Sequence, residues 1–255
     1  MTTIPKSHPR AKSLVLRESL VKGFEQGLVA TEGLLAQGRG EAFDYLIGEK
    51  TNFEAKKAIK AAAAVLLLAK NPIISVNGNF VALCSKEIIR FSKISKAKIE
   101  INLFYDDGSR RKRIAKFLKS KGAKVILGHD IKHLTKIPKL KSNRGRVDKR
   151  GISSADVVLV PLEDGDRTSF LKKLGKTVIT FDLNPLSRTA QTADITVVDN
   201  ISRGFDELIN TYMKLSKRNM NELENIIQNF DNKTNLANSI MSINKNLRRR
   251  ARKLA

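Results

Sequence analysis

The sequence contains one cysteine, Cys84, and no tryptophan. A single thiol excludes an intrachain disulfide and a cysteine-ligated metal cluster, and it fits a protein that works in a reducing compartment. Aromatic residues make up only 5% of the chain. A surface on which nucleic-acid bases could stack is therefore poorly supported.

Long apolar segments are also lacking. The longest apolar run, Ala61 to Ala69, is too short to cross the hydrocarbon core of a bilayer, which needs about 20 residues. The first ten residues, MTTIPKSHPR, contain no apolar stretch, so no signal peptide is expected. We therefore expect a cytoplasmic protein without a membrane partner.

Positive charge is abundant but unevenly distributed. The net charge is +23, and residues 86–150 alone hold 21 basic and 6 acidic residues. Residues 151–200 are instead slightly acidic, with 5 basic and 7 acidic residues. A basic surface suggests a polyanionic partner, either nucleic acid or a phosphorylated small molecule. The alternative is an ordinary solvated, lysine-rich surface.

Short apolar runs predict six strands. The last three are rich in β-branched residues and do not alternate apolar with polar residues, which is typical of strands buried on both faces of a parallel sheet. Helical segments alternate with the strands, so we predict an α/β three-layer sandwich with a mostly parallel sheet. The predicted strands are Ile73–Val76, Lys98–Tyr105, Val125–Leu127, Val157–Val160, Val178–Phe181 and Ile195–Val198.

Apolar spacing and end signals predict the helices. Thr51 and Glu54 have the spacing of a capping box, and so do Asn219 and Glu222. The predicted helices span 10–28, 40–47, 51–70 and 109–120, and two or three more follow Ser202. In the first of them, one face carries Leu14, Val21, Phe24 and Leu28.

We expect one domain over residues 1–255. It would consist of an N-terminal helical segment (1–71), a sheet core (72–200) and C-terminal helices (201–255). The basic segment 129–154 contains Pro138 and is predicted to be a surface loop or flap. His129 and His133 lie four residues apart but lack a third ligand at metal spacing, so no metal site is predicted.

Polar, turn-forming segments follow the last three predicted strands. Ligands of open parallel sheets bind outside the carboxyl ends of the strands, so these loops would gather at one edge. Each alone could be an ordinary turn, but three in succession, one of which carries Arg188, indicate a site. The segments are Glu163–Thr168, Asp182–Thr189 and Asp199–Asn200. Asn77-Gly78-Asn79, after the first strand, is either a phosphate-binding turn or a simple βα turn.

Several blocks of the sequence resemble one family. They are IPKSHPR, GRGEAFDYLIGE (38–49), SVNGN (75–79), EINLFY (100–105), PLEDGDRT, FDLNPLSRTA and ADITVVDN. In this order they are similar to the archaeal 4-phosphopantoate–β-alanine ligases, also called phosphopantothenate synthetases. The resemblance runs from about Ile4 to Asn200. It implies a Rossmann-like, homodimeric enzyme that joins 4-phosphopantoate to β-alanine with ATP, releasing AMP and pyrophosphate through an acyl-adenylate.

The resemblance also implies which residues meet the nucleotide. Arginine suits a phosphate because its planar fork pairs with two oxygens at once, and glycines on both sides of Arg39 would let the backbone approach a ligand closely. The implied contacts are Arg17, Arg39, Asp182, Leu183, Asn184, Arg188, Thr189, Asn200 and Ile201. Mg²⁺ is expected with ATP, with Asp164 or Asp166 as candidate ligands. No catalytic base is assigned.

Two other functions compete with the ligase. A nucleic-acid-binding protein is favoured by the charge alone, but it does not explain why the acidic stretch 151–200 carries the most distinctive motifs. An oxidoreductase that binds NAD or another nucleotide would suit the predicted sheet. The chain lacks the G-x-G-x-x-G fingerprint of such enzymes, however.

Overall fold

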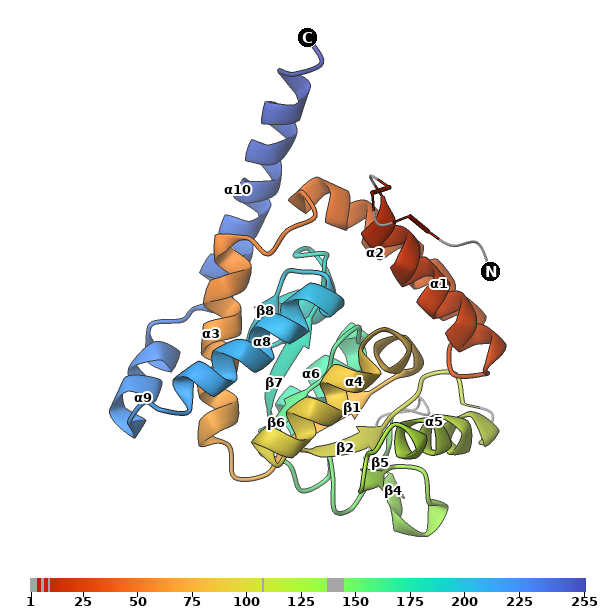
Figure 1. The fold of residues 1–255 in the computed structure, drawn as a ribbon. Coiled ribbons are helices and arrows are strands. Elements are labelled where there is room, and N and C mark those ends of the chain that lie inside the picture. Colours follow the sequence, from red (N-terminus) through yellow and green to blue (C-terminus); the bar gives the residue numbers. More distant parts are fainter. Residues whose placement is uncertain (1–3, 6, 9, 107, 137–144) are drawn as a thin grey trace.

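The structure, a computed structural model, describes residues 4–5, 7–8, 10–106, 108–136 and 145–255. A six-stranded sheet lies at its centre in the order β3-β2-β1-β6-β7-β8, and every neighbouring pair in it is parallel (Figure 1). The strands are β1 (Pro72–Val76), β2 (Lys98–Ile101), β3 (Ile126–Leu127), β6 (Val157–Leu159), β7 (Thr177–Phe181) and β8 (Ile195–Val197). The predicted α/β fold is confirmed, and the strand order is that of a Rossmann sheet.

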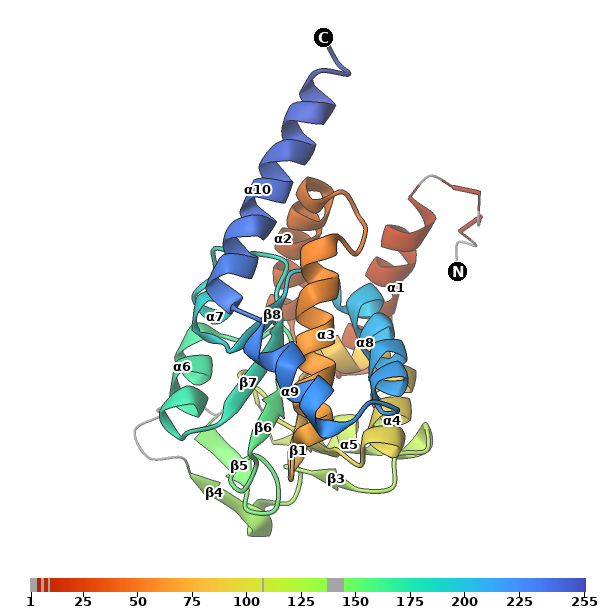
Figure 2. The ribbon, with the colours of Figure 1, turned by 90° about the vertical axis from the view of Figure 1, so that its left-hand side faces the viewer.

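Helices cover both faces of the sheet, as Figures 1 and 2 show from two sides. One face packs against α3 (Phe53–Leu68), α4 (Gly78–Ser95), α5 (Ser109–Ser120) and α8 (Ile201–Leu215). The other packs against α6 (Gly165–Lys173) and α7 (Arg188–Thr192). Neighbouring strand residues point to opposite faces, so Ile74 joins the first core and Ile73 the second. Both faces are therefore buried.

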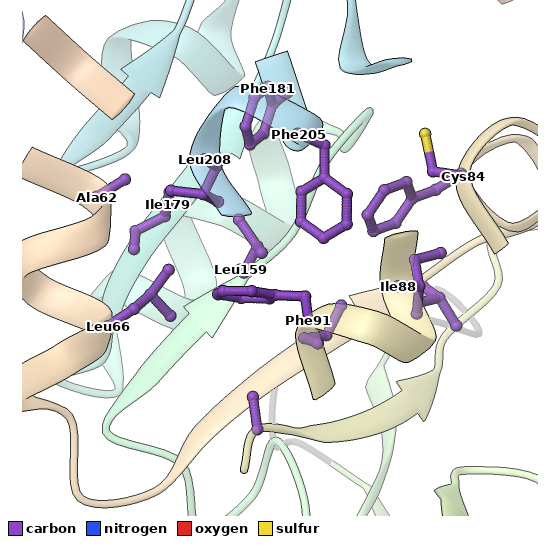
Figure 3. Close-up of a cluster of buried hydrophobic side chains, with 14 of the residues drawn as sticks. Ala62, Leu66, Cys84, Ile88, Phe91, Leu159, Ile179, Phe181, Phe205 and Leu208 are labelled. Carbon is purple, nitrogen blue, oxygen red and sulfur yellow. The ribbon is translucent and has the colours of Figure 1, made fainter. Parts of the chain in front are cut away.

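An aromatic cluster fills the larger core. The ring of Phe205, from α8, lies edge-on to Phe80 (5.0 Å between centroids), Phe91 (5.6 Å) and Phe181 (6.3 Å). Figure 3 shows Phe205 among the side chains of α3, α4, β6 and β7. Gly204 permits this approach, because a Cβ there would stand 2.7 Å from the Phe181 ring. The cluster fixes α8, and with it the loop after β8.

The segment after β3 is more ordered than predicted. It contains a short 3₁₀ helix, η1 (Ile131–His133), and an antiparallel pair, β4 (Leu134–Lys136) with β5 (Arg146–Asp148). Val147 and Ile152 are fully buried in the second core. Their apolar side chains explain why the flap prediction was wrong for these residues. Pro138 and Asn143, also assigned to the flap, lie outside the described residues.

The predicted strand Lys98–Tyr105 is too long. Strand β2 ends at Ile101, although the Asn102 amide still donates to the Val76 carbonyl oxygen (2.9 Å). Its neighbours are short: β1 ends at Val76, and β3 has two residues. Among the described residues no partner strand extends beyond that point, and Phe104 and Tyr105 leave the sheet and are exposed.

The N-terminal helices differ from prediction in three respects. Helix α1 (Ala11–Glu25) packs through Leu20 and Gly23, whereas Val21 and Phe24 are exposed. Helix α2 (Thr31–Ile47) starts nine residues earlier than predicted and contains Gly38 and Gly40. Helix α3 is capped by Asn52, whose side chain accepts from the Ala55 amide (2.8 Å). The predicted cap residue, Thr51, has another partner.

The C-terminal helices follow the predicted pattern. Helix α9 (Met220–Gln228) begins with the predicted capping box of Asn219 and Glu222. Asp231 caps α10 (Asn232–Ala251), which packs on α2 and α3 and then extends away from the body (Figure 1). Within the described residues, none of the helices combines the length and apolar character needed to span a membrane.

Candidate functional site

The order of the strands reverses between β1 and β6. Helix α4 leaves β1 toward one face and α6 leaves β6 toward the other, which is the arrangement beside which open α/β sheets bind their ligands. Asn77 ties the two ends together, because its side-chain amide donates to the carbonyl oxygens of Pro161 (3.0 Å) and Leu162 (3.2 Å). Among the described helices that begin at this edge, four have side-chain caps: Asn77, Asp164, Ser187 and Asn200.

The loop after β7 is braced by Asp182. Its carboxylate accepts from the Asn184 amide (2.9 Å) and from the Ser187 hydroxyl. Burial raises the pKa of Asp182, while the Ser187 and Asn184 hydrogen bonds and the charge of Arg39 lower it, with a net rise. Leu183 is buried against α2, where it packs with Phe43 and Ile47. Arg39, Asp182, Leu183 and Asn184 are thus brought together.

Arg188 begins α7 and lies at the open edge. Its Nη2 is 2.6 Å from Asp166 Oδ1, in an ion pair whose side chains are 76% and 72% exposed. The first turns of α6 and α7 touch, because a Cβ on Gly165 would stand 2.5 Å from the Cβ of Arg188. Thr189 is buried, and its hydroxyl donates to the Glu163 carbonyl oxygen (2.9 Å). Thr189 therefore holds the two loops together through its side chain.

Arg17 is held by a carboxylate of α2. Its guanidinium donates two hydrogen bonds of 2.8 Å to Glu41, which also accepts from the Tyr45 hydroxyl (2.9 Å). The hydrogen bond with Glu41 raises the pKa of Arg17. Arg39, two residues before Glu41, is also exposed. Gly38 and Gly40, on either side of it, lie inside α2, although the helix was predicted to begin only at residue 40.

The loop after β8 is the most deeply buried part of the edge. Asn200 and Ile201 are each 3% exposed. The Asn200 side-chain amide donates to Asp44 (3.1 Å), and its oxygen accepts from the Ser202 amide (3.1 Å). Asp199 accepts from Thr51 (2.6 Å) and from Arg203 (2.6 Å). Burial raises the pKa of Asp199, and the charge of Arg203 opposes that rise.

Sequence reasoning missed several residues of this edge. Asp44 and Glu41 lie in the GRGEAFDYLIGE block, and Asp199 lies in a predicted site segment, but Arg203 carried no signal of its own. The contacts of Asp44 with Arg203 and of Thr51 with Asp199 join residues 159 and 148 positions apart. Such contacts cannot be read from spacing along one chain.

A buried ionic cluster lies beneath the switch point. Arg167 pairs with Glu163 and donates to the Ser75 hydroxyl (3.1 Å). Glu100 accepts from the amides of Asp148 (2.9 Å) and Ile152 (2.6 Å), which fastens the segment after β5 to β2. Burial raises the pKa of Glu100 to about 7, against these hydrogen bonds and the charge of Arg167.

The described residues hold no group of three His, Cys, Asp or Glu side chains that could bind a metal ion. The Asp164 side chain caps α6 by accepting from the Arg167 amide (2.8 Å). Asp166 lies beside Arg188, and His133 is 3.7 Å from Asp130. The edge thus offers arginines, helix N-termini and single carboxylates, a set that suits a phosphorylated ligand better than a bare cation.

The strand order and the helices on both faces define a Rossmann-like α/β protein, a class in which ligands bind at the switch point of the sheet. The family model described as phosphopantothenate/pantothenate synthetase matches residues 54–246, and the chain belongs to that family. The resemblance expected from the motif blocks is confirmed.

Full-length relatives agree with the family. A 4-phosphopantoate–β-alanine ligase of Thermococcus kodakarensis is 49% identical over 252 residues, covering 98% of this chain and 96% of that protein. The ligase of Thermococcus onnurineus is 50% identical, covering 95% and 93%. That of Methanosarcina mazei is 46% identical, covering 97% of each chain. The similarity therefore extends beyond the last motif block, which ends at Asn200, and includes the C-terminal helices.

Glu100 generates a prediction on pH and stability. Its pKa is higher in the folded chain than its ordinary value of 4.5, so its contribution to stability is full below about pH 4.5 and is lost as the pH rises through about 7. Glu100→Gln removes this titration. The variant's free energy of unfolding, relative to the wild type, should rise across that window by on the order of 3 kcal/mol.

Urea unfolding at several pH values between 4.5 and 7.5 measures this difference. Glu25→Gln, at an exposed position, is the control and should leave the pH profile unchanged. Parallel profiles for Glu100→Gln and the wild type would contradict the raised pKa.

Proposed function

We propose that this chain is an ATP-dependent ligase that condenses 4-phosphopantoate with β-alanine to 4-phosphopantothenate, a reaction of coenzyme A biosynthesis. The observation that carries the proposal is the identity of 46–50% to curated ligases of that name over nearly the whole chain. The motif blocks of the resemblance also supply the loops of the carboxyl edge.

In the proposed reaction, the carboxylate of 4-phosphopantoate attacks the α-phosphorus of ATP. The bond to pyrophosphate breaks, and an acyl-adenylate forms. The neutral amine of β-alanine then attacks the acyl carbon, the new C–N bond forms, AMP leaves, and the amine loses a proton. Negative charge develops on phosphate oxygens in the first step, so fixed cations and N–H groups at the edge would lower its barrier.

Arg188 and Arg39 are the cations best placed for the phosphates. Arg188 is paired with Asp166 on the surface, and an exposed pair of this kind contributes at most about 1 kcal/mol. Exchanging Asp166 for a phosphate therefore costs little. The N-termini of α7 and α8 add backbone N–H groups at the same edge. Asp182 and Asn184 would orient the nucleoside beside them.

Mg²⁺ would arrive with the nucleotide. Mg²⁺ usually keeps several waters and binds through phosphates and one or two carboxylates. Asp166 is the exposed carboxylate at the edge and would supply one oxygen. The Asp164 carboxylate already caps α6. When bound, the ion would neutralise phosphate charge.

We further propose a cytoplasmic homodimer. The exposed apolar residues Val15, Val21 and Phe24 on α1 favour an interface between copies, and a particle of 28.4 kDa in light scattering would contradict it. ATP is available in the cytoplasm.

Neither the family nor its relatives support the nucleic-acid-binding or oxidoreductase alternatives.

The first test identifies the products. AMP and pyrophosphate should form only when ATP, 4-phosphopantoate and β-alanine are all present. Unphosphorylated pantoate should react poorly, because a site built around a phosphate leaves its cations unmatched without one. Chromatography of the nucleotides measures the outcome, and ADP with orthophosphate would indicate an acyl-phosphate route instead.

The second test concerns Arg188. Arg188→Ala should lose a charge-assisted contact to ATP worth about 1.5–3 kcal/mol, and Arg188→Lys should recover only part because it lacks the planar fork. The melting temperature should stay near the wild-type value, since the side chain is exposed. Wild-type kinetics in Arg188→Ala would show that the surface ion pair is its whole role.

A further inference from the structure

Helix α2 lies across the loops that follow β7 and β8. Arg39 and Gly40 face the β7 loop through Asp182 and Leu183, and one turn later Asp44 reaches the β8 loop. Figures 1 and 2 show α2 beyond the end of the sheet, between α1 and α10. The helix thus carries one of the implied nucleotide contacts but belongs to neither layer of the sandwich.

A shared ion network fastens α2 to the β8 loop. Asp44 accepts from both terminal nitrogens of Arg203, at 3.0 Å and 2.6 Å. Arg203 also donates to Asp199 at 2.6 Å. Asp44 and Asp199 are 6% and 1% exposed. Removing one partner of such a pair leaves a buried charge unmatched, which is far costlier than losing a surface pair.

Asp44 also sets the orientation of Asn200. Because the Asp44 carboxylate can only accept hydrogen bonds, the Asn200 amide must turn its NH₂ group toward it. The Asn200 oxygen then faces the first turn of α8, where it accepts from the Ser202 amide (3.1 Å) and hydroxyl (2.8 Å). One carboxylate therefore fixes both α2 and the cap of α8.

Helix α2 has other polar contacts, but they join it to other helices. The Asn79 side chain, from α4, donates to the Gly33 carbonyl oxygen (2.8 Å), and Asn246, from α10, donates to that of Leu46 (2.8 Å). In the middle of α2, Glu41 accepts from Arg17 of α1.

The Asp44 network differs from these contacts because it joins α2 to the β8 loop. Two glycines, Gly38 and Gly40, flank Arg39, and glycine weakens a helix interior. We therefore expect the position of Arg39 over the loops to be sensitive to this network.

We infer that Asp44 and Arg203 are positioning residues, which hold α2 on the β7 and β8 loops so that Arg39 and Asn200 stand together at the nucleotide. The inference rests on the function proposed above. Neither residue needs to touch the nucleotide. They would affect ATP binding indirectly, by placing Arg39 and Asn200. This indirect effect distinguishes them from residues that only stabilise the fold.

Asp44→Asn and Arg203→Lys test the inference. Asparagine sets an NH₂ group against the donors of Arg203 or Asn200, and lysine cannot pair with Asp44 and Asp199 through one planar fork. Each variant should raise the KM for ATP about tenfold or more, while the KM for 4-phosphopantoate stays within about twofold. Arg203→Lys keeps the positive charge, so this variant alone tests the inference if Asp44→Asn does not fold.

Coupling to Arg39 separates positioning from stability. In the wild type, Arg39→Ala should raise the KM for ATP. In the Asp44→Asn background, Arg39→Ala should raise the KM for ATP by a further factor of about two or less, because Arg39 is already displaced. Glu32→Gln is the matched control, because Glu32 is an exposed carboxylate in the first turn of α2. This variant should have the wild-type KM for ATP and for 4-phosphopantoate.

Three results would overturn the inference: a wild-type KM for ATP in folded Arg203→Lys and Asp44→Asn, equal effects on both substrates, or a full additive effect of Arg39→Ala. A wild-type protein that makes no AMP from the three substrates would instead refute the proposed function. In that case, calorimetric titration with ATP alone still decides the positioning role through the same variants.

Discussion

The pairing of β1 with β6 is the constraint on which the rest of the structure depends. Ile74 lies opposite Leu159 in this parallel pair, and Asn77 closes its carboxyl end by bonding to the chain beyond β6. Because consecutive crossovers in a parallel sheet keep the same hand, the strands on either side of the pair send their helices to opposite faces. The capped N-termini of α4 and α6 and the polar loops of the carboxyl edge follow from this arrangement.

Much of the fold could be predicted because its signals are local. Strands buried on both faces appear as uninterrupted β-branched runs, and β7 and β8 were predicted to within a residue at each end. The failures have physical reasons. Strand β2 stops where partners end, and Val147 and Ile152 are apolar residues in a segment whose charge suggested a loop. Helix α2 was predicted to begin only at residue 40, but it starts at Thr31 and runs through Gly38 and Gly40, residues that weaken a helix interior.

The grouping of the polar loops was predictable, but the contacts between their side chains were not. Polar residues that follow parallel strands must meet at one edge, so Asp182, Asn184 and Arg188 could be grouped from the chain alone. Thr51 could not be assigned to Asp199, because no periodicity links residues 148 positions apart. Much of the positive charge, on α5 and around β3, lies on the side of the sheet away from β7 and β8.

The resting pair of Arg188 with Asp166 has a consequence for ionic strength. Salt weakens contacts between exposed charges, and a bare arginine would lose affinity for a phosphate as salt rises. In the proposed complex the phosphate would replace a carboxylate whose pairing salt weakens as well, so one ion pair with Arg188 would be exchanged for another. The competition from Asp166 would lower the affinity for the phosphate but also make that affinity less sensitive to salt. The proposed ligand contact would thus be partly protected from changes in ionic strength.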